Sequence, residues 1–156
     1  MIKLQRLGHI LINVRDIERS KAFYTKILGF EILEQDPDHG GLFLSIGSYG
    51  NTLDIFQSTN PDDFPQPKSR LGNREGMGVR HIAFAVATEE ELKQAYFALQ
   101  DAGVPIYRAV DHTSQKSVYF YDPHENLLEI VWERPNVRAI FAAGRQDSDQ
   151  PVSFER

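Results

Sequence analysis

The chain has 156 residues, of which 41% are hydrophobic and 25% charged, as in a soluble protein of one domain or two small half-domains. It contains no cysteine, which excludes disulfides and thiolate metal sites and leaves histidine and carboxylate side chains as metal ligands. The formal net charge of −5 disfavours nucleic acid and anionic membranes as partners, and no apolar stretch approaches the ~20 residues of a membrane span.

The predicted elements begin with a strand over residues 7–14. The chain enters this strand without the apolar core of a signal peptide, so we expect a cytoplasmic protein. Asp16 is a suitable N-cap, and apolar side chains at helical spacing predict a helix that ends at Gly29. Short apolar runs separated by Gly- and Asn-rich turns then predict three strands, over residues 30–33, 41–46 and 52–56.

The second half of the chain has the same order of elements. A strand is predicted over residues 79–86, and Thr88 with Glu91 forms a capping box that opens a helix ending at Gly103. Three further strands are predicted over residues 104–107, 117–121 and 126–132. A short helix over residues 137–143 follows, and the polar tail after it is expected to be mobile.

Three pairs of positions indicate an internal duplication. His9 and His81 are 72 residues apart (81 − 9), Gly29 and Gly103 are 74 apart (103 − 29), and Asp54 and Glu129 are 75 apart (129 − 54). The predicted fold class is therefore α+β, with two tandem βαβββ modules. The modules occupy residues 1–60 and 79–135, a proline-containing linker spans 61–78, and 136–156 form a partly mobile C-terminal tail.

Polar residues inside the apolar strands are the candidates for function. Glu129 shares a strand face with Leu127 and Val131, and an unpaired carboxylate on such a face is costly unless it meets a cation, a donor or a metal. His81 and His9 lie in two other apolar strands. Two histidines and one glutamate are the ligand set of a facial-triad metal site, which is the hypothesis that these residues support.

These residues resemble the vicinal oxygen chelate superfamily, which includes glyoxalase I, type I extradiol dioxygenases and bleomycin resistance proteins. The resemblance spans residues 7–133: residues 9–16 with Phe23, Tyr24 and the Leu28–Phe30 run look like its opening strand and helix, and Asp122-Pro123 before Glu129 looks like its closing hairpin. It implies curled mixed sheets around a metal site, a small-molecule substrate, and a homodimer. Carried over by motif, His9, His81 and Glu129 would hold one divalent metal per chain.

One further stretch resembles the extradiol dioxygenase signature. It runs from Val110-Asp111-His112 through Val118-Tyr119 to Glu129, although Glu125 stands where that signature has Gly or Pro. The resemblance implies catalytic roles for His112 and Tyr119 and favours Fe(II), with Mn(II), Ni(II) and Zn(II) as alternatives. Those enzymes often carry an acid–base histidine upstream of the second ligand histidine, and residues 61–80 contain none.

Two alternatives stay open at this point. Asp54 aligns with Glu129 in the duplicated unit, at a position where glyoxalase I-like proteins supply a fourth ligand, usually Glu. If Asp54 reaches the metal, two coordination positions stay open, which suits an isomerase, epimerase or lyase better than a dioxygenase. Metal-free members of the superfamily, such as bleomycin resistance proteins, only bind a small molecule.

Overall fold

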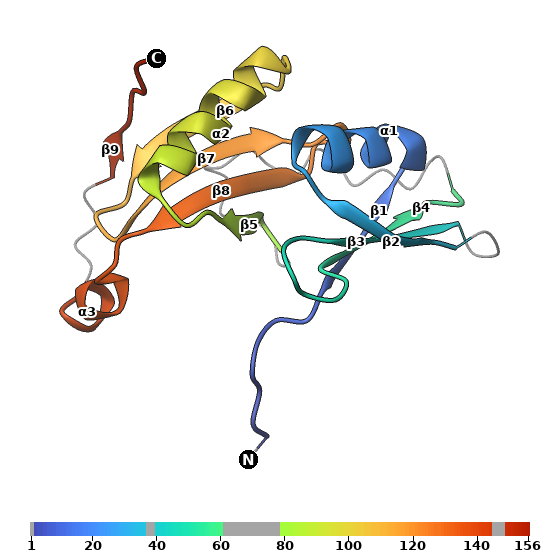
Figure 1. Cartoon of the computed structure of the whole chain (residues 1–156), viewed down its shortest axis with the longest axis horizontal. Coiled ribbons are helices and arrows are strands. Elements are labelled where there is room, and N and C mark those ends of the chain that lie inside the picture. Colours follow the sequence, from blue (N-terminus) through green and yellow to red (C-terminus); the bar gives the residue numbers. More distant parts are fainter. Residues whose placement is uncertain (1, 37–39, 61–78, 145–148) are drawn as a thin grey trace. The chain divides into compact units, whose positions relative to one another are not determined.

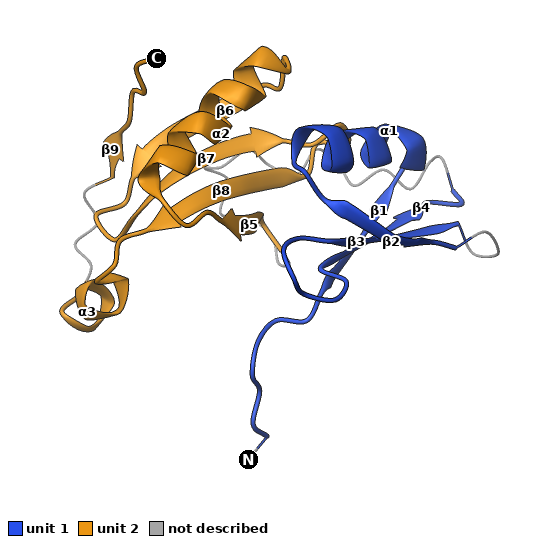
Figure 2. Cartoon of the chain, in the orientation of Figure 1, with its two compact units in different colours: residues 1–66 blue, residues 67–156 orange. Residues whose placement is uncertain are grey.

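The computed structural model describes residues 2–36, 40–60, 79–144 and 149–156. The chain divides into two compact units, residues 1–66 and 67–156 (Figure 2). Both units contain one strand, then a helix, then three strands, which confirms the predicted α+β fold class of two βαβββ modules. The predicted linker over 61–78 lies outside the described residues.

Unit 1 is a four-stranded mixed sheet with one helical segment (Figure 1). The strand order is β1-β4-β3-β2, with β1 and β4 parallel and the other neighbours antiparallel. The elements are β1 (Ile10–Val14), α1 (Ile17–Ala22), η1 (Phe23–Ile27), β2 (Glu31–Gln35), β3 (Gly41–Ser45) and β4 (Leu53–Gln57).

The helix of unit 1 begins as predicted and changes from α-helix to π-helix after six residues. The Asp16 carboxylate accepts the Arg19 N–H at 2.9 Å, which confirms the predicted N-cap. From Phe23 the helix continues as one π-helical turn, and both Phe23 and Tyr24 are buried there. Gly29, with φ +74°, ends the helical segment in the left-handed region that glycine adopts without strain.

Unit 2 repeats the arrangement and adds a strand. The order is β5-β8-β7-β6-β9, again with the first pair parallel and the rest antiparallel. Helix α2 packs on β7 and β8, and its Thr88–Glu91 capping box is present with both reciprocal hydrogen bonds, as predicted. The elements are β5 (Ile82–Ala85), α2 (Glu89–Asp101), β6 (Ile106–Asp111), β7 (Gln115–Tyr121), β8 (Leu127–Glu133), α3 (Val137–Ala142) and β9 (Gln150–Pro151).

The two units match residue by residue along their parallel strand pairs. Leu11 lies opposite Asp54 in unit 1, and Ala83 lies opposite Glu129 in unit 2. An irregularity in register also recurs, between Ile32 and Glu34 in β2 and between residues 106 and 108 in β6. The repeat is thus visible in strand pairing as well as in the order of elements.

Each unit has its own apolar core. In unit 1, Leu42, Leu44, Leu53 and Ile55 of β3 and β4 are at most 1% exposed. In unit 2 the most deeply buried apolar side chains come from α2, β7 and β8; they are Leu92, Leu99, Val118, Phe120 and Leu128. Burying one such side chain contributes roughly 1.5–3 kcal/mol, so these strands and helices are held mainly by packing. In the part of the chain that the structure describes, no helix is long and apolar enough to cross a lipid bilayer.

The chain after β8 contains more regular structure than its polar composition predicts. The predicted helix over 137–143 is present as α3. Residues 149–156, called here the C-terminal segment, pair with β6 through Gln150 and Pro151. The segment lies along the outer edge of the unit 2 sheet (Figure 1). Backbone hydrogen bonding to an open sheet edge orders a segment that has little apolar surface of its own.

Candidate metal centre

His81 and Glu129 meet at one end of the unit 2 sheet. His81 Nε2 lies 2.9 Å from Glu129 Oε2. His81 was predicted inside a strand, but it lies one residue before β5, where regular pairing with β8 begins at Ile82. Because His81 is two residues before Ala83, its side chain projects from the same face as Ala83, the strand partner of Glu129. The parallel register therefore brings the imidazole to the carboxylate.

Glu129 is 2% exposed and its second oxygen is also hydrogen-bonded. Ser117 Oγ donates to Glu129 Oε1 at 2.5 Å, and Gln115 Nε2 donates to the same oxygen at 3.5 Å. Burial raises the pKa of Glu129, but the hydrogen bonds from His81 and Ser117 outweigh it and hold that pKa below its usual value. The carboxylate is therefore ionised at neutral pH, as a metal ligand must be.

Unit 1 contains the equivalent pair in a looser form. His9 directly precedes β1, and its Nε2 lies 3.5 Å from Asp54 Oδ2. Asp54 is 4% exposed, and its other oxygen accepts a hydrogen bond from Asn51 Nδ2 at 2.8 Å. The aspartate is one methylene shorter than the glutamate of unit 2, and the contact with its histidine is correspondingly longer.

Each unit thus offers a histidine nitrogen and a carboxylate oxygen that converge. In both pairs the other carboxylate oxygen is held by a neutral donor, which is the kind of support that orients a metal ligand. Within neither unit do the described residues gather three histidine or carboxylate side chains. The residue types fit a divalent metal, and the predicted ligands are divided between His9 in unit 1 and His81 with Glu129 in unit 2.

Tyr119 lies beside this pair, directly across from Glu129 in the β7–β8 ladder. Its ring meets the His81 ring edge-on, with centroids 5.7 Å apart, and the Arg108 guanidinium lies 5.2 Å from its centroid. Burial and the negative charge of Glu129 raise the pKa of Tyr119 to about 12. Tyr119 is therefore a neutral phenol at neutral pH and keeps a proton to donate.

His112 completes the cluster of unit 2. It follows β6 directly and is 8% exposed, and its Nε2 lies 3.0 Å from the Tyr119 hydroxyl. Its Nδ1 lies 2.6 Å from Asp149 Oδ1 in the C-terminal segment. The structure thus brings together His112 and Tyr119, the two residues predicted from the signature, and adds Asp149. Asp149 was not found from the sequence, because it lies 37 residues from His112 in a tail that was predicted to be mobile.

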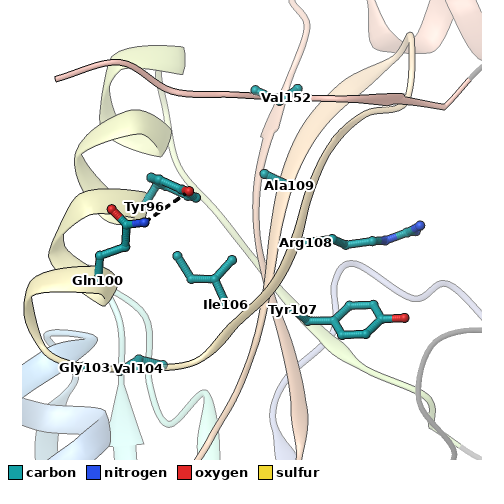
Figure 3. A pocket seen from close by; sticks show the side chains of 9 residues that line it. All are labelled: Tyr96, Gln100, Gly103, Val104, Ile106, Tyr107, Arg108, Ala109 and Val152. Carbon is teal, nitrogen blue, oxygen red and sulfur yellow. Dashed lines mark hydrogen bonds between the residues drawn. The ribbon is translucent and has the colours of Figure 1, made fainter.

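A cavity of about 580 Å³ lies elsewhere in unit 2, between α2, β6 and Val152 of the C-terminal segment (Figure 3). Tyr96 and Gln100 face it from the helix, and Gln100 Nε2 donates to the Tyr96 hydroxyl at 3.2 Å. None of the predicted site residues lines this cavity. Arg108 lines the cavity and also contacts the Tyr119 ring.

Comparison with known families agrees with this arrangement. Residues 6–130 match the Glyoxalase/Bleomycin resistance protein/Dioxygenase superfamily. The chain belongs to this superfamily. The match runs from before β1 into β8 and so includes both βαβββ modules of the glyoxalase-like fold.

Relatives of this glyoxalase-like chain cover most of its length. "Uncharacterized protein YwkD" of Bacillus subtilis is 32% identical over 133 residues, which are 81% of the chain and 96% of that protein. The solved structure of a glyoxalase family protein from Enterococcus faecalis is 33% identical, covers 81% of the chain and 97% of its own, and has a TM-score of 0.60. Catechol-2,3-dioxygenase of Bacillus subtilis is 26% identical over 129 residues, which are 83% of the chain but 42% of that enzyme.

The glyoxalase-like chain departs from the extradiol signature at Glu125, and the structure shows how the turn accommodates the glutamate. Glu125 has φ +65°, in the left-handed region that favours glycine. The Asp122 carboxylate supports the turn by accepting the backbone N–H groups of His124 at 2.9 Å and Asn126 at 2.8 Å. The turn before β8 therefore keeps the conformation that a glycine would adopt, although a glutamate occupies the position.

Proposed function

We propose that the chain is a metal-dependent enzyme that cleaves a catechol-type ring with O₂. The observation that carries this proposal is the convergence of His81 and an ionised Glu129, at 2.9 Å, beside a buried Tyr119 that is paired with His112. The similarity to catechol-2,3-dioxygenase, 26% identical over 83% of the chain, supports the reaction class.

His9, His81 and Glu129 are the proposed ligands of one Fe(II) per chain. When bound, such a metal supplies Lewis acidity and adjacent open coordination positions at which two reactants meet. His9 belongs to unit 1, and His81 and Glu129 belong to unit 2. Ser117 and Gln115 hold the far oxygen of Glu129 and so keep its near oxygen directed toward His81.

Tyr119 and His112 are the proposed proton-transfer residues. Tyr119 is neutral, and its hydroxyl can accept a proton from a catechol hydroxyl while it passes its own proton to His112 Nε2, 3.0 Å away. This exchange deprotonates the substrate, leaves the phenol neutral and places the proton on the imidazole. General acid–base catalysis of this kind typically contributes about 10²–10⁴-fold to a rate.

The test is the EPR spectrum of the Fe(II)-loaded protein with nitric oxide, a probe for O₂ binding, before and after adding catechol. The proposal expects a nitric oxide signal whose rhombicity changes when catechol binds, because both molecules then occupy the site together. Loss of the signal on adding catechol would contradict the three-ligand site. Absence of any signal would favour a metal-free small-molecule binding protein.

A second candidate function rests on Asp54. This aspartate is buried and already lies 3.5 Å from His9 Nε2, so it is a candidate for a fourth ligand. A four-ligand site would favour an isomerase or lyase that acts on a carbonyl substrate. Displacement of nitric oxide by catechol in the wild type, but joint binding of both in Asp54→Ala, would identify this alternative.

A further inference from the structure

The C-terminal segment is attached to unit 2 at several points. Val152 N–H donates to Ala109 O at 3.1 Å, next to the β6–β9 pairing. Phe154 packs on Tyr96 with ring centroids 5.0 Å apart. Arg156 hydrogen-bonds the Asp101 carboxylate and lies 5.1 Å from the centroid of the Phe97 ring. These contacts fix the course of residues 150–156 along β6 and α2.

Asp149 is where this segment reaches the candidate site. The β6–β9 register places Gln150 opposite Asp111, so Asp149 comes next to His112, the residue that follows β6. Asp149 Oδ1 then lies 2.6 Å from His112 Nδ1. The imidazole is 8% exposed and the Asp149 side chain 45%, so the carboxylate stays partly hydrated while it meets a buried ring.

The chemistry of this contact decides which ring nitrogen of His112 carries the proton. A carboxylate only accepts hydrogen bonds, so a neutral His112 must place its proton on Nδ1 to meet Asp149. Nε2 then has a free lone pair directed at the Tyr119 hydroxyl, 3.0 Å away. In the other tautomer, Nε2 would be a donor and the lone pair of Nδ1 would face a carboxylate.

We propose that Asp149 is a positioning residue that holds His112 in its Nδ1–H tautomer and presents Nε2 as the acceptor for Tyr119. The inference rests on the proposed function for its catalytic meaning, because His112 takes the Tyr119 proton only in this tautomer. When that proton arrives, the imidazolium that forms is paired with the Asp149 carboxylate. Asp149 itself gains no proton and touches no substrate.

The experiment that tests this inference is long-range ¹H–¹⁵N NMR of the histidine side chains in the full-length, metal-free chain, at a pH where the imidazoles are neutral. The His112 signals are assigned by their loss in His112→Gln. We expect the wild type to show predominantly the Nδ1–H tautomer, and Asp149→Ala to lose that preference. Glu155→Ala is the matched control, since it removes an exposed carboxylate from the same segment and should leave the tautomer unchanged.

Several outcomes would overturn the inference. A wild-type His112 in the Nε2–H form would do so without any variant, and so would an Asp149→Ala protein that keeps the Nδ1–H tautomer. Asp149→Glu, which restores the carboxylate, should recover the wild-type preference at least in part. In the Fe(II)-loaded chain with catechol, Asp149→Ala should lower kcat by about tenfold or more with little change in KM. If no form of the protein cleaves catechol, the proposed function fails, while the tautomer measurement still decides the role of Asp149.

Discussion

The Nε2 atom of His81 lies 2.9 Å from Glu129 Oε2, and the duplicated unit contains the same contact between His9 and Asp54 at 3.5 Å. In both units the histidine stands just before the first strand, and the carboxylate lies in the strand that pairs with it in parallel. The duplication has thus placed the same pair of functional groups twice. The unit 2 pair has a glutamate, a hydroxyl donor from Ser117 and a neighbouring phenol, Tyr119.

We predict that His81→Ala and Glu129→Ala each abolish stoichiometric metal binding. Loss of one of three protein ligands leaves too few to hold a divalent ion through dialysis. The measurement is metal per chain by elemental analysis after Fe(II) or Zn(II) loading. His124→Ala, in the turn before β8, is the control and should bind normally. Full binding by either ligand variant would exclude the proposed ligand set.

His112→Ala should retain the metal and lose turnover. The side chain contacts Tyr119 and Asp149 rather than the His81–Glu129 pair, so its removal spares the ligands. Loss of an acid–base group typically lowers kcat by about 10²–10⁴-fold. Metal analysis and catechol-cleavage kinetics on the same sample measure both effects. Unchanged kcat would exclude a catalytic role for His112.

Ser117→Ala should destabilise the metal-free chain. Ser117 is 1% exposed and donates to the buried Glu129 at 2.5 Å, so the variant removes one of the hydrogen bonds that hold this charged carboxylate. Loss of a hydrogen bond to a charged group typically costs about 1.5–3 kcal/mol, and the urea midpoint should fall accordingly. Ser153→Ala, at an exposed position, should leave the midpoint unchanged. Equal midpoints for the two variants would mean that Ser117 does not stabilise Glu129.

The phenol of Tyr119 should make the metal-free chain less stable at alkaline pH. Burial and the charge of Glu129 raise its pKa from 10.0 in the unfolded chain to about 12 in the folded state. The contribution of this pKa shift to the free energy of unfolding is therefore complete below pH 10. It is lost as the pH rises to about 12, and it amounts to roughly 2–3 kcal/mol. Urea unfolding of the wild type and of Tyr119→Phe through this range measures the difference. The wild type should lose stability more steeply; parallel curves would contradict the pKa shift.

The sequence by itself determined the features that depend on local pattern. Asp16 and the Thr88–Glu91 capping box predicted where helices begin because caps act within one turn. Each predicted strand is present, but its ends are shifted by a few residues. The alternation of apolar and polar residues predicts that a strand exists more reliably than it predicts the residues at which the strand begins and ends. The order of elements and the three recurring offsets predicted the duplication. Polar residues in apolar strands identified His9, His81 and Glu129 as the candidates, and the alignment of the two halves added Asp54.

Only the tertiary structure decided which side chains meet. Ser117 became the partner of Glu129 through the β7–β8 register, and Asp149 reached His112 across 37 residues because β9 pairs with the edge of β6. The tail contains so few apolar residues that its composition did not predict an ordered structure. Its order comes from backbone hydrogen bonds to the β6 edge, which almost any residues can make, together with the contacts of Phe154 with Tyr96 and of Arg156 with Asp101. Contacts of this kind depend on where strands end and pair, and that is a property of the folded unit rather than of any local stretch of sequence.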